Sequence, residues 1–462
     1  MNMRTARRHL FLCLAALAVL VPALHAQRTG FSRDEYVRRR QALVGSVKDG
    51  VVILFGETGA PPAGHFRQDN DFFYFSGCQD ANAILVMAAR TGETFLFLPQ
   101  QSPREEMVGG PNLLKDSAAK DRLALSEIQP LSYFDEYLAR NLERLGRVLY
   151  VRLSPGDAVD EARSEVGLMT ARRSRTHYND QLSLDNYRIS KLRDRYPQCE
   201  LREIVPFIDA LRVIKSEEEI AVLRRNGRIS ALAVREAMLA SRPGGFEYEV
   251  EAAAVGAVLK GGARGPAYAP IVGSGPNSCI WHYEKNERRI EKGELVLMDF
   301  GADLDMMTMD ITRTWPVSGK FSDEQRDIYR TVLEVQKACI AAFRPGLTSK
   351  DVREAVALHL KKKGLDPRGL SGGLGHFVGL SVHDVGPDGD VVLKEGMVMA
   401  IEPALYYPEK GIGIRIEDTV LITRNGCEVL TADVPKEIDE VERLLAGRNK
   451  SANIPMHREK RT

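Results

Sequence analysis

Short apolar runs separated by helical stretches make up the first part of the chain. Four such runs, bounded by Gly, Asp or Pro, predict buried strands at 51–55, 83–87, 94–98 and 147–151. The stretches between them predict helices or helical turns at 33–44, 103–106 and 132–145. This alternation predicts an α/β N-terminal domain over residues 27–204, with a largely parallel sheet.

The pattern changes near residue 205. Ser216 followed by Glu219 forms a capping box, and it predicts the start of a helix that ends before Pro243. Further strands are expected at 270–273, 294–300, 307–315, 398–402 and 414–421, and helices at 322–343 and 349–363. Hairpins and helices in separate runs predict an α+β second domain over 205–446. The polar, basic stretch 447–462 predicts a mobile tail.

The first 26 residues have the layout of a secretory signal peptide. Arg4, Arg7 and Arg8 precede an apolar run at 10–21, and the small residue Ala26 follows. A buried N-terminal helix would explain the apolar run but not the arginines. The run is shorter than the roughly 20 residues that span a bilayer. We therefore expect cleavage after Ala26, an exported protein (periplasmic or secreted) and no integral membrane segment after cleavage.

Composition narrows the function classes. The chain has 44% hydrophobic and 27% charged residues, which is typical of soluble globular proteins. Lys and Arg number 64 against 63 Asp and Glu, so the basic excess of a nucleic-acid binder is missing. The six cysteines include no Cys-x-x-Cys pair, which argues against a disulfide framework or a zinc finger. One or two long-range disulfides remain open in an oxidising compartment.

Asp299 and Asp310 are the first candidates for chemistry, because both lie in apolar, strand-like surroundings. A turn at 304–305 would make them direct cross-strand neighbours on one face, about 5 Å apart at Cβ. Two carboxylates at this distance in a partly buried setting need a proton or a cation between them. The pair alone allows equally that one of them faces solvent or caps a turn.

Further polar residues follow in the same domain. His376 and His383 are seven residues apart after a glycine run, and both could be ordinary core or surface histidines. Arg415 and Glu417 are two residues apart on a predicted strand and so share one face. Glu402 follows an apolar run, and if buried it needs an arginine or a metal as partner.

Together these positions supply four carboxylates and an imidazole. Such oxygen-rich sites suit manganese or a similar divalent ion. Two bridged cations about 3.5–4 Å apart could activate water and polarise a carbonyl or phosphoryl group. The residues alone therefore indicate a possible two-metal hydrolase, and they do not identify its substrate.

The motifs around these residues resemble a known family. The second half is similar to the pita-bread metallopeptidases, and the whole mature chain resembles the bacterial Xaa-Pro aminopeptidases (aminopeptidase P). The segments at 31–44 and 66–77 resemble the family's N-terminal domain. The motifs of the second half are His282-Tyr-Glu, Met298-Asp-Phe-Gly301, Met309-Asp-Ile-Thr-Arg-Thr-Trp315, Gly375-His376, Val382-His-Asp-Val385, Ile401-Glu-Pro403 and Gly413-Ile-Arg-Ile-Glu-Asp418.

The resemblance implies a pita-bread catalytic domain with two divalent metal ions, Mn²⁺ in first place and Zn²⁺ or Co²⁺ as alternatives. The implied ligands are Asp299, Asp310, His376, Glu402 and Glu417. By this resemblance Asp310 and Glu417 bridge the metals, Asp299 binds one of them, and His376 and Glu402 bind the other.

The resemblance also implies roles in catalysis. Glu402 shuttles a proton and His383 hydrogen-bonds the substrate carbonyl as it becomes tetrahedral. His282 positions the scissile peptide, and Arg415 orders the carboxylates.

The activity implied is hydrolysis of the bond between an N-terminal residue and a following proline, so the partners are peptides with proline second. A prolidase restricted to dipeptides has the same ligands, although the segment 66–77 favours the aminopeptidase. A non-catalytic binding protein with the pita-bread fold is a third hypothesis, and the presence of all five ligands argues against it. Homo-oligomers are common in the family. Many members carry a histidine where this chain has Gly372, so substrate contacts near the scissile bond are expected to differ.

Overall fold

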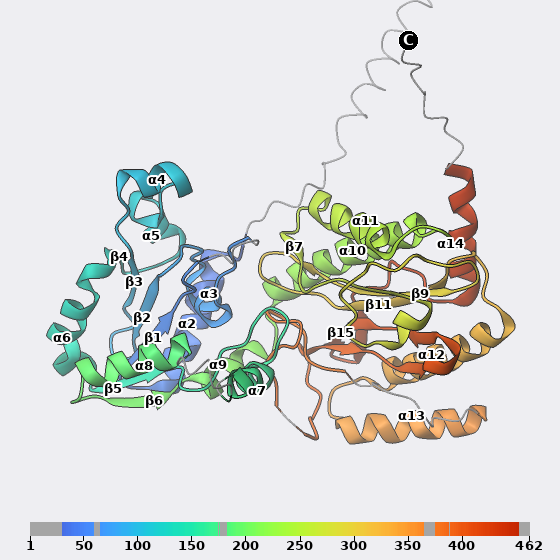
Figure 1. Cartoon of the computed structure of the whole chain (residues 1–462). Helices are drawn as coiled ribbons and strands as arrows, with labels where there is room; N and C mark the ends of the chain where they lie inside the picture. The colour runs from blue at the N-terminus through green and yellow to red at the C-terminus, as the bar shows by residue number, and fades with distance from the viewer. Residues whose placement is uncertain are drawn as a thin grey trace, which may run out of the picture.

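The computed structural model describes residues 30–59, 65–173, 175, 183–364, 375–387 and 389–451. These residues form an α/β N-terminal domain and an α+β second domain, called the catalytic domain after its predicted role, and the two lie side by side (Figure 1). The predicted signal peptide, Gly372 and residues 452–462 lie outside the described residues. No helix within the described ranges is both long and apolar enough to cross a membrane.

The N-terminal domain is built on one six-stranded sheet in the order β4-β3-β2-β1-β5-β6. The sheet is mixed, so the prediction of a largely parallel sheet is wrong at its centre. There β1, β2 and β3 pair antiparallel, whereas β4, β5 and β6 join in parallel. The connection at 89–93 is too short for the crossover of a dozen or more residues that parallel neighbours need. The strands are β1 (Val51–Phe55), β2 (Ile84–Ala88), β3 (Thr94–Leu98), β4 (Glu127–Pro130), β5 (Val148–Val151) and β6 (Glu200–Glu203).

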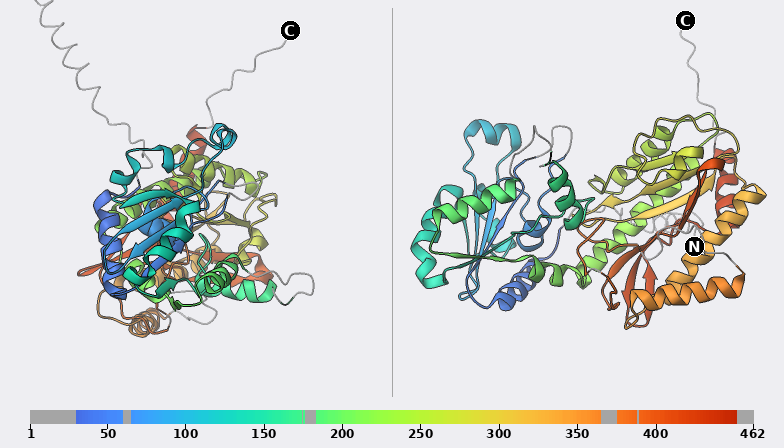
Figure 2. Two further views of the ribbon diagram at one scale, coloured as in Figure 1. Left: turned by 90° about the vertical axis from the view of Figure 1, so that its left-hand side faces the viewer. Right: turned by 60° about the horizontal axis from the view of Figure 1, so that its bottom comes forward.

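Helices cover both faces of this sheet (Figure 2). Alternate residues of β1 belong to different cores: Val52 and Leu54 pack with Phe72 on one face, and Val51 and Ile53 face the other. Burial on both faces explains why the strands read as continuous apolar runs. The helices are α2 (Arg33–Val47), α3 (Asn70–Ser76), α4 (Pro103–Gly109), α5 (Ala119–Arg122), α6 (Phe134–Leu145), α7 (Arg163–Arg173) and α8 (Leu184–Arg195).

The catalytic domain begins after β6. The capping box of Ser216 and Glu219 is present at the start of α10, as predicted. The last helix extends through Ser451, so residues 447–451 of the predicted tail are helical. The helices are α9 (Val205–Arg212), α10 (Glu217–Ala240), α11 (Glu247–Lys260), α12 (Asp323–Ala342), α13 (Ser349–Lys363) and α14 (Ile438–Ser451).

Small antiparallel sheets form the centre of this domain. Strand β9 lies between β8 and β11 in one sheet, and β15 lies between β12 and β16 in another. Two strands, not one, occupy 412–423, with Ile416 and Glu417 between them. The strands are β7 (Gly265–Pro266), β8 (Ile271–Ser274), β9 (Leu295–Phe300), β10 (Ala302–Asp303), β11 (Ile311–Pro316), β12 (Val398–Ile401), β13 (Ala404–Tyr407), β14 (Ile412–Arg415), β15 (Asp418–Thr423) and β16 (Gly426–Val429).

The register between β9 and β11 differs from the predicted one. Asp299 is paired with Thr312, not with Asp310. The turn is centred on Asp305 and Met306, which both have positive φ angles, and not on 304–305. A shift of two residues keeps the same face, because side chains alternate along a strand. Asp310 is therefore the diagonal neighbour of Asp299.

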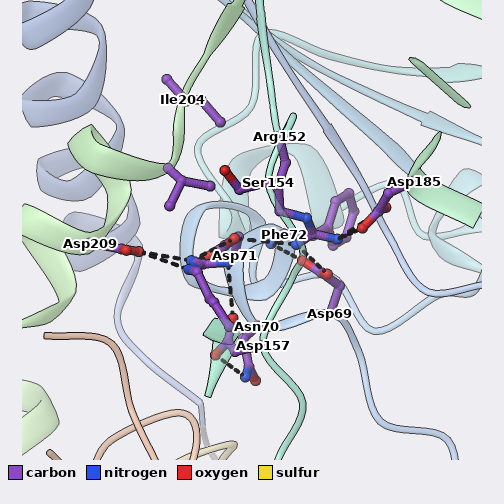
Figure 3. Close-up of polar contacts among 12 residues, drawn as sticks. Asp69, Asn70, Asp71, Phe72, Arg152, Ser154, Asp157, Asp185, Ile204 and Asp209 are labelled. Carbon is purple, nitrogen blue, oxygen red and sulfur yellow. Dashed lines mark hydrogen bonds and ion pairs between the residues drawn. The ribbon is translucent and has the colours of Figure 1, made fainter. Parts of the chain in front are cut away.

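A buried ion network joins the two domains. Arg212 in α9 donates to Asp71 at 2.7 Å, to Asp157 at 2.7 Å and to Asp384 at 2.5 Å. Asp71 also accepts from Arg163 at 2.9 Å. Figure 3 shows Asp71 and Asp157 close together in this network. Because Asp384 directly follows His383, the network connects the N-terminal domain to a candidate catalytic residue.

Candidate metal centre

Three predicted ligands converge in the catalytic domain. Asp310, His376 and Glu417 each offer a ligand atom, and these atoms all lie within 4.8 Å of one another. Asp310 directly precedes β11, and Glu417 lies between β14 and β15. His376 follows Gly375, where a Cβ would lie 2.3 Å from the carbonyl oxygen of Ala400. Glycine at 375 therefore allows the close backbone approach that brings His376 to the other two ligands.

Glu417 has an unsatisfied buried oxygen. Thr312 donates to its Oε2 at 2.7 Å, but Oε1 has no hydrogen-bond partner within the described part of the chain. Burial and the charge of Asp310 raise the pKa of Glu417 well above its usual range. A buried carboxylate oxygen without a donor requires a proton or a cation.

Asp299 and Asp310 share a single donor. The hydroxyl of Tyr268 lies 2.6 Å from Oδ1 of Asp299 and 2.5 Å from Oδ1 of Asp310. Burial and the charge of Asp299 raise the pKa of Asp310 to about 7. A hydroxyl carries one proton, so the two ionised carboxylates cannot both be satisfied by Tyr268. Asp299 has a second partner in the guanidinium of Arg415, and Asp310 has one in Nε2 of His376.

His376 lies between carboxylates. Its Nε2 is 3.3 Å from Oδ2 of Asp310 and 3.8 Å from Oε1 of Glu402, at the end of β12. Its Nδ1 is 3.1 Å from the carbonyl oxygen of Phe377. Burial would lower the pKa of His376, but the hydrogen bond to Asp310 and its charge raise it to about 9. A backbone carbonyl on Nδ1 leaves Nε2 as the nitrogen that can bind a metal.

Arg415 orders the carboxylates from one side. Its buried guanidinium pairs with Asp299, and its Nε donates to the hydroxyl of Thr312 at 2.9 Å. A further contact at 3.1 Å reaches the hydroxyl of Tyr406. Thr312 in turn donates to Glu417. Arg415 therefore fixes both the carboxylate of Asp299 and the hydroxyl that binds Glu417.

The other two predicted catalytic residues lie around this centre. The ring centroid of His383 is 4.3 Å from that of His376, and its Nδ1 is 2.9 Å from Oε2 of Glu165. Burial and the neighbouring His376 lower the pKa of His383. His282 is exposed and, together with Asp299 and Glu402, lines one open cavity. Both domains line it, since Glu165 comes from the N-terminal domain.

Several residues that hold this site together are not among the predicted site residues. Tyr268, Thr312, Tyr406 and Glu165 all contact predicted site residues. Thr312 could have been found, because it stands two residues after Asp310 and hence on the same strand face. Tyr268 and Glu165 carry no local signal, since only the tertiary fold brings them to the site.

The donor set fits a divalent cation. Four carboxylates and one imidazole are the ligands that Mn²⁺ and similar ions prefer. Such an ion would satisfy the buried Oε1 of Glu417, which has no hydrogen-bond partner in the described part of the chain. The chemistry available is activation of water and polarisation of a carbonyl beside general acid–base groups.

Comparison with known proteins agrees with this geometry. Residues 221–424 match the profile of metallopeptidase family M24, and residues 36–150 match that of the aminopeptidase P N-terminal domain. The Xaa-Pro aminopeptidase of Escherichia coli is 36% identical over 91% of this chain and 99% of its own length. The Xaa-Pro aminopeptidase of Haemophilus influenzae is 33% identical over 89% of this chain and 97% of its own length.

A solved structure shows the same likeness in three dimensions. Aminopeptidase P from E. coli with the inhibitor Pro-Leu superposes with a TM-score of 0.78 at 33% identity. The superposition covers 91% of this chain and 100% of that one. The similarity thus extends over both domains, and the five predicted ligands lie within residues 221–424, which match the M24 profile.

Proposed function

The chain belongs to the Xaa-Pro aminopeptidases, metallopeptidases of family M24, and from this premise we propose that it is an exported enzyme with two divalent metal ions, Mn²⁺ foremost. One observation carries the metal proposal. The buried Oε1 of Glu417 has no hydrogen-bond partner in the described structure, and it belongs to the trio with Asp310 and His376.

Five residues would hold the metals. Asp299, Asp310, His376, Glu402 and Glu417 would be the ligands, since four carboxylates and one imidazole suit such ions. When bound, the ions supply a nucleophilic water at neutral pH and a Lewis acid for the scissile carbonyl.

The chain's own groups handle the proton and the substrate. Glu402 is part exposed at the cavity and accepts the proton of the attacking water, then passes it to the departing proline nitrogen. His383 hydrogen-bonds the substrate carbonyl oxygen as negative charge develops on it. His282, at the cavity wall, positions the scissile peptide.

A metal analysis with an activity assay tests the enzyme proposal. The purified protein should contain two divalent ions per chain. A chelator should abolish release of the first residue from Ala-Pro-Ala, and Mn²⁺ should restore it better than Zn²⁺ or Co²⁺. Cleavage that persists in the chelated protein would contradict the metal mechanism.

The length of the preferred substrate tests the aminopeptidase assignment. Turnover of Ala-Pro should be compared with that of Ala-Pro-Ala and longer peptides. We expect the longer peptides to be hydrolysed at least as well. Hydrolysis restricted to the dipeptide would instead identify a prolidase.

Export and assembly have separate tests. Because Arg4, Arg7 and Arg8 precede an apolar run, the mature protein should begin near Gln27 and be found outside the cytoplasm. A protein that keeps Met1 would contradict export. We also propose a homo-oligomer, and light scattering on the purified protein should give a mass above that of one chain.

A further inference from the structure

Glu165 belongs to the N-terminal domain, yet its carboxylate reaches the catalytic domain. Its Oε2 lies 2.9 Å from Nδ1 of His383, a residue 218 positions away in the sequence. We propose that Glu165 is a positioning residue, which fixes the imidazole of His383 so that Nε2 serves the substrate. The inference rests on the proposed function, in which His383 contacts the substrate carbonyl.

The contact determines which nitrogen of His383 is available. A carboxylate only accepts hydrogen bonds, so Nδ1 of His383 donates its proton to Glu165. Nε2 makes no hydrogen bond within the described part of the chain, and His383 lines the cavity. Holding Nδ1 therefore sets both the ring orientation and the tautomer, as carboxylates do for other histidines in active sites.

Glu165 is itself fixed at the start of α7. Its Oε2 also accepts a hydrogen bond of 2.7 Å from the backbone N–H of Ala162. Two residues before it, Arg163 pairs with Asp71 and Asp209, each at 2.9 Å. Figure 3 shows Asp71 and Asp209 in this cluster. The carboxylate of Glu165 therefore projects from the first turn of a helix whose N-terminal end is fixed by these bonds.

The segment that carries His383 is anchored to both domains. The N–H of Val382 donates to the carbonyl oxygen of Val159 at 2.7 Å. Asp384 accepts from Arg212 at 2.5 Å and from Lys215 at 2.9 Å. His383 is therefore held by bonds of the residues on both sides of it, and Glu165 by the N–H of Ala162 and the ion pairs of Arg163.

A capping role is the alternative explanation of Glu165. In that case the carboxylate would only stabilise α7 through Ala162, and it would act independently of His383. A cap contributes to stability and not to turnover. The two explanations therefore differ in whether the effect of Glu165 requires His383.

A double-mutant cycle decides between them. Glu165→Ala, Glu165→Gln, His383→Ala and the double variant Glu165→Ala/His383→Ala would be assayed with Mn²⁺ and the peptide Ala-Pro-Ala. We expect Glu165→Ala to lower kcat about 10–100-fold, the usual cost of losing such a partner, with KM and metal content near wild type. Its Tm should fall slightly, because the N–H of Ala162 loses its acceptor. Glu165→Gln should lose less, because its amide oxygen still accepts. In the His383→Ala background, Glu165→Ala should have no further effect on kcat.

Glu161→Gln is the matched control, since it removes the same charge four residues earlier on the same segment. It should keep wild-type kcat. The ¹⁵N-histidine NMR spectrum of the metal-free protein gives an independent readout. The His383 signals, identified by their loss in His383→Ala, should show a proton on Nδ1 in the wild type and a mixture of tautomers in Glu165→Ala.

Two outcomes would overturn the inference. The first is that Glu165→Ala keeps wild-type kcat or an unchanged His383 tautomer although His383→Ala is impaired. This outcome would refute the positioning role of Glu165 and leave the proposed function intact. The other is an equal loss from Glu165→Ala with and without His383. Normal turnover in His383→Ala would instead refute the proposed role of His383 and the positioning role together.

Discussion

At the scale of single residues, the buried carboxylates are held close together at a cost to the metal-free protein. Asp310 illustrates this cost, because burial and the charge of Asp299 raise its pKa to about 7. Asp310→Asn keeps the shape of the side chain and removes one negative charge. We expect it to lose metal and turnover while the fold persists. In the presence of chelator its Tm should be no lower than that of the wild type, because like-charge repulsion is relieved.

Metal content by elemental analysis and Tm by calorimetry check this prediction. Asp327→Asn, on the exposed side of α12, is a control of the same chemistry and should leave metal content and turnover unchanged. A fully active Asp310→Asn with two bound metals would contradict the assignment of Asp310 as a metal ligand.

The two histidines of the centre should separate metal binding from catalysis. His376 lies 3.3 Å from Asp310, whereas the polar contact of His383 is with Glu165. His376→Ala should therefore reduce metal content and turnover together. His383→Ala should keep the metal and lower turnover about 10²–10³-fold, as expected when a hydrogen bond to a developing oxyanion is lost.

Turnover, metal content and Tm on both variants check this expectation. If His383 were only a packed core residue, His383→Ala would lower Tm and keep the activity of each folded molecule. That result would remove His383 from the catalytic set.

At the scale of elements, the hairpin of β9 and β11 positions two of the proposed metal ligands, Asp299 and Asp310. Gly301 follows Asp299 by two residues, and a Cβ there would lie 1.6 Å from the carbonyl oxygen of Met309. Such a distance requires the backbone beside Asp310 to move. Gly301→Ala should consequently reduce both stability and metal content, because the ligand Asp310 is displaced with Met309.

Gly256→Ala, in α11, is the matched control. A Cβ at Gly256 meets nothing within 4 Å, so alanine should stabilise the helix by up to about 1 kcal/mol. Denaturant unfolding and metal titration of both variants test the comparison. Equal stability of Gly301→Ala and wild type would show that this hairpin does not constrain Asp310.

Local sequence signals predicted the elements better than their pairing. The capping box of Ser216 was correct because it depends only on residues four apart or closer. The face shared by Asp299 and Asp310 was also correct, because alternation survives a shift of two residues. The register was wrong because positive φ angles at Asp305 and Met306 moved the turn. Backbone conformation at such non-glycine positions is not readable from residue types.

In the candidate site, too, residues within local motifs were predicted and residues brought in by long-range contacts were not. Family motifs gave the five predicted ligands, and the structure brings Asp310, His376 and Glu417 into one cluster. Tyr268 and Glu165 were missed, since each reaches the site through tertiary contacts of 31 to 218 residues separation. No local pattern marks such partners. Physical reasoning on the fold is needed to find them.

At the scale of the whole molecule, the buried ion network determines how the domains hold the active site. Burial alone would raise the pKa of Asp71, but the charges of Arg163 and Arg212 hold it well below its usual range. Burial acts against ionisation of Asp384 in the same way, and Lys215 and Arg212 lower its pKa. Removing Arg212 takes one partner from three buried carboxylates, although Asp71 keeps Arg163 and Asp384 keeps Lys215. Since breaking a buried pair costs about 3–5 kcal/mol, the loss is expected to be at most of that size.

Arg212→Met should accordingly lower the free energy of unfolding by up to that amount at pH 7 and reduce turnover, because Asp384 adjoins His383 in the chain. The dependence of the unfolding free energy on pH in the acidic range gives a sharper test. Carboxylates with a depressed folded-state pKa stabilise the fold fully above their unfolded pKa of about 3.9, and this contribution is lost as the pH falls below it. The stability difference between wild type and Arg212→Met should thus be constant from pH 7 to about pH 5 and shrink below about pH 4. Denaturant unfolding across this range measures it, and a difference that grows towards low pH would contradict the role of these carboxylates.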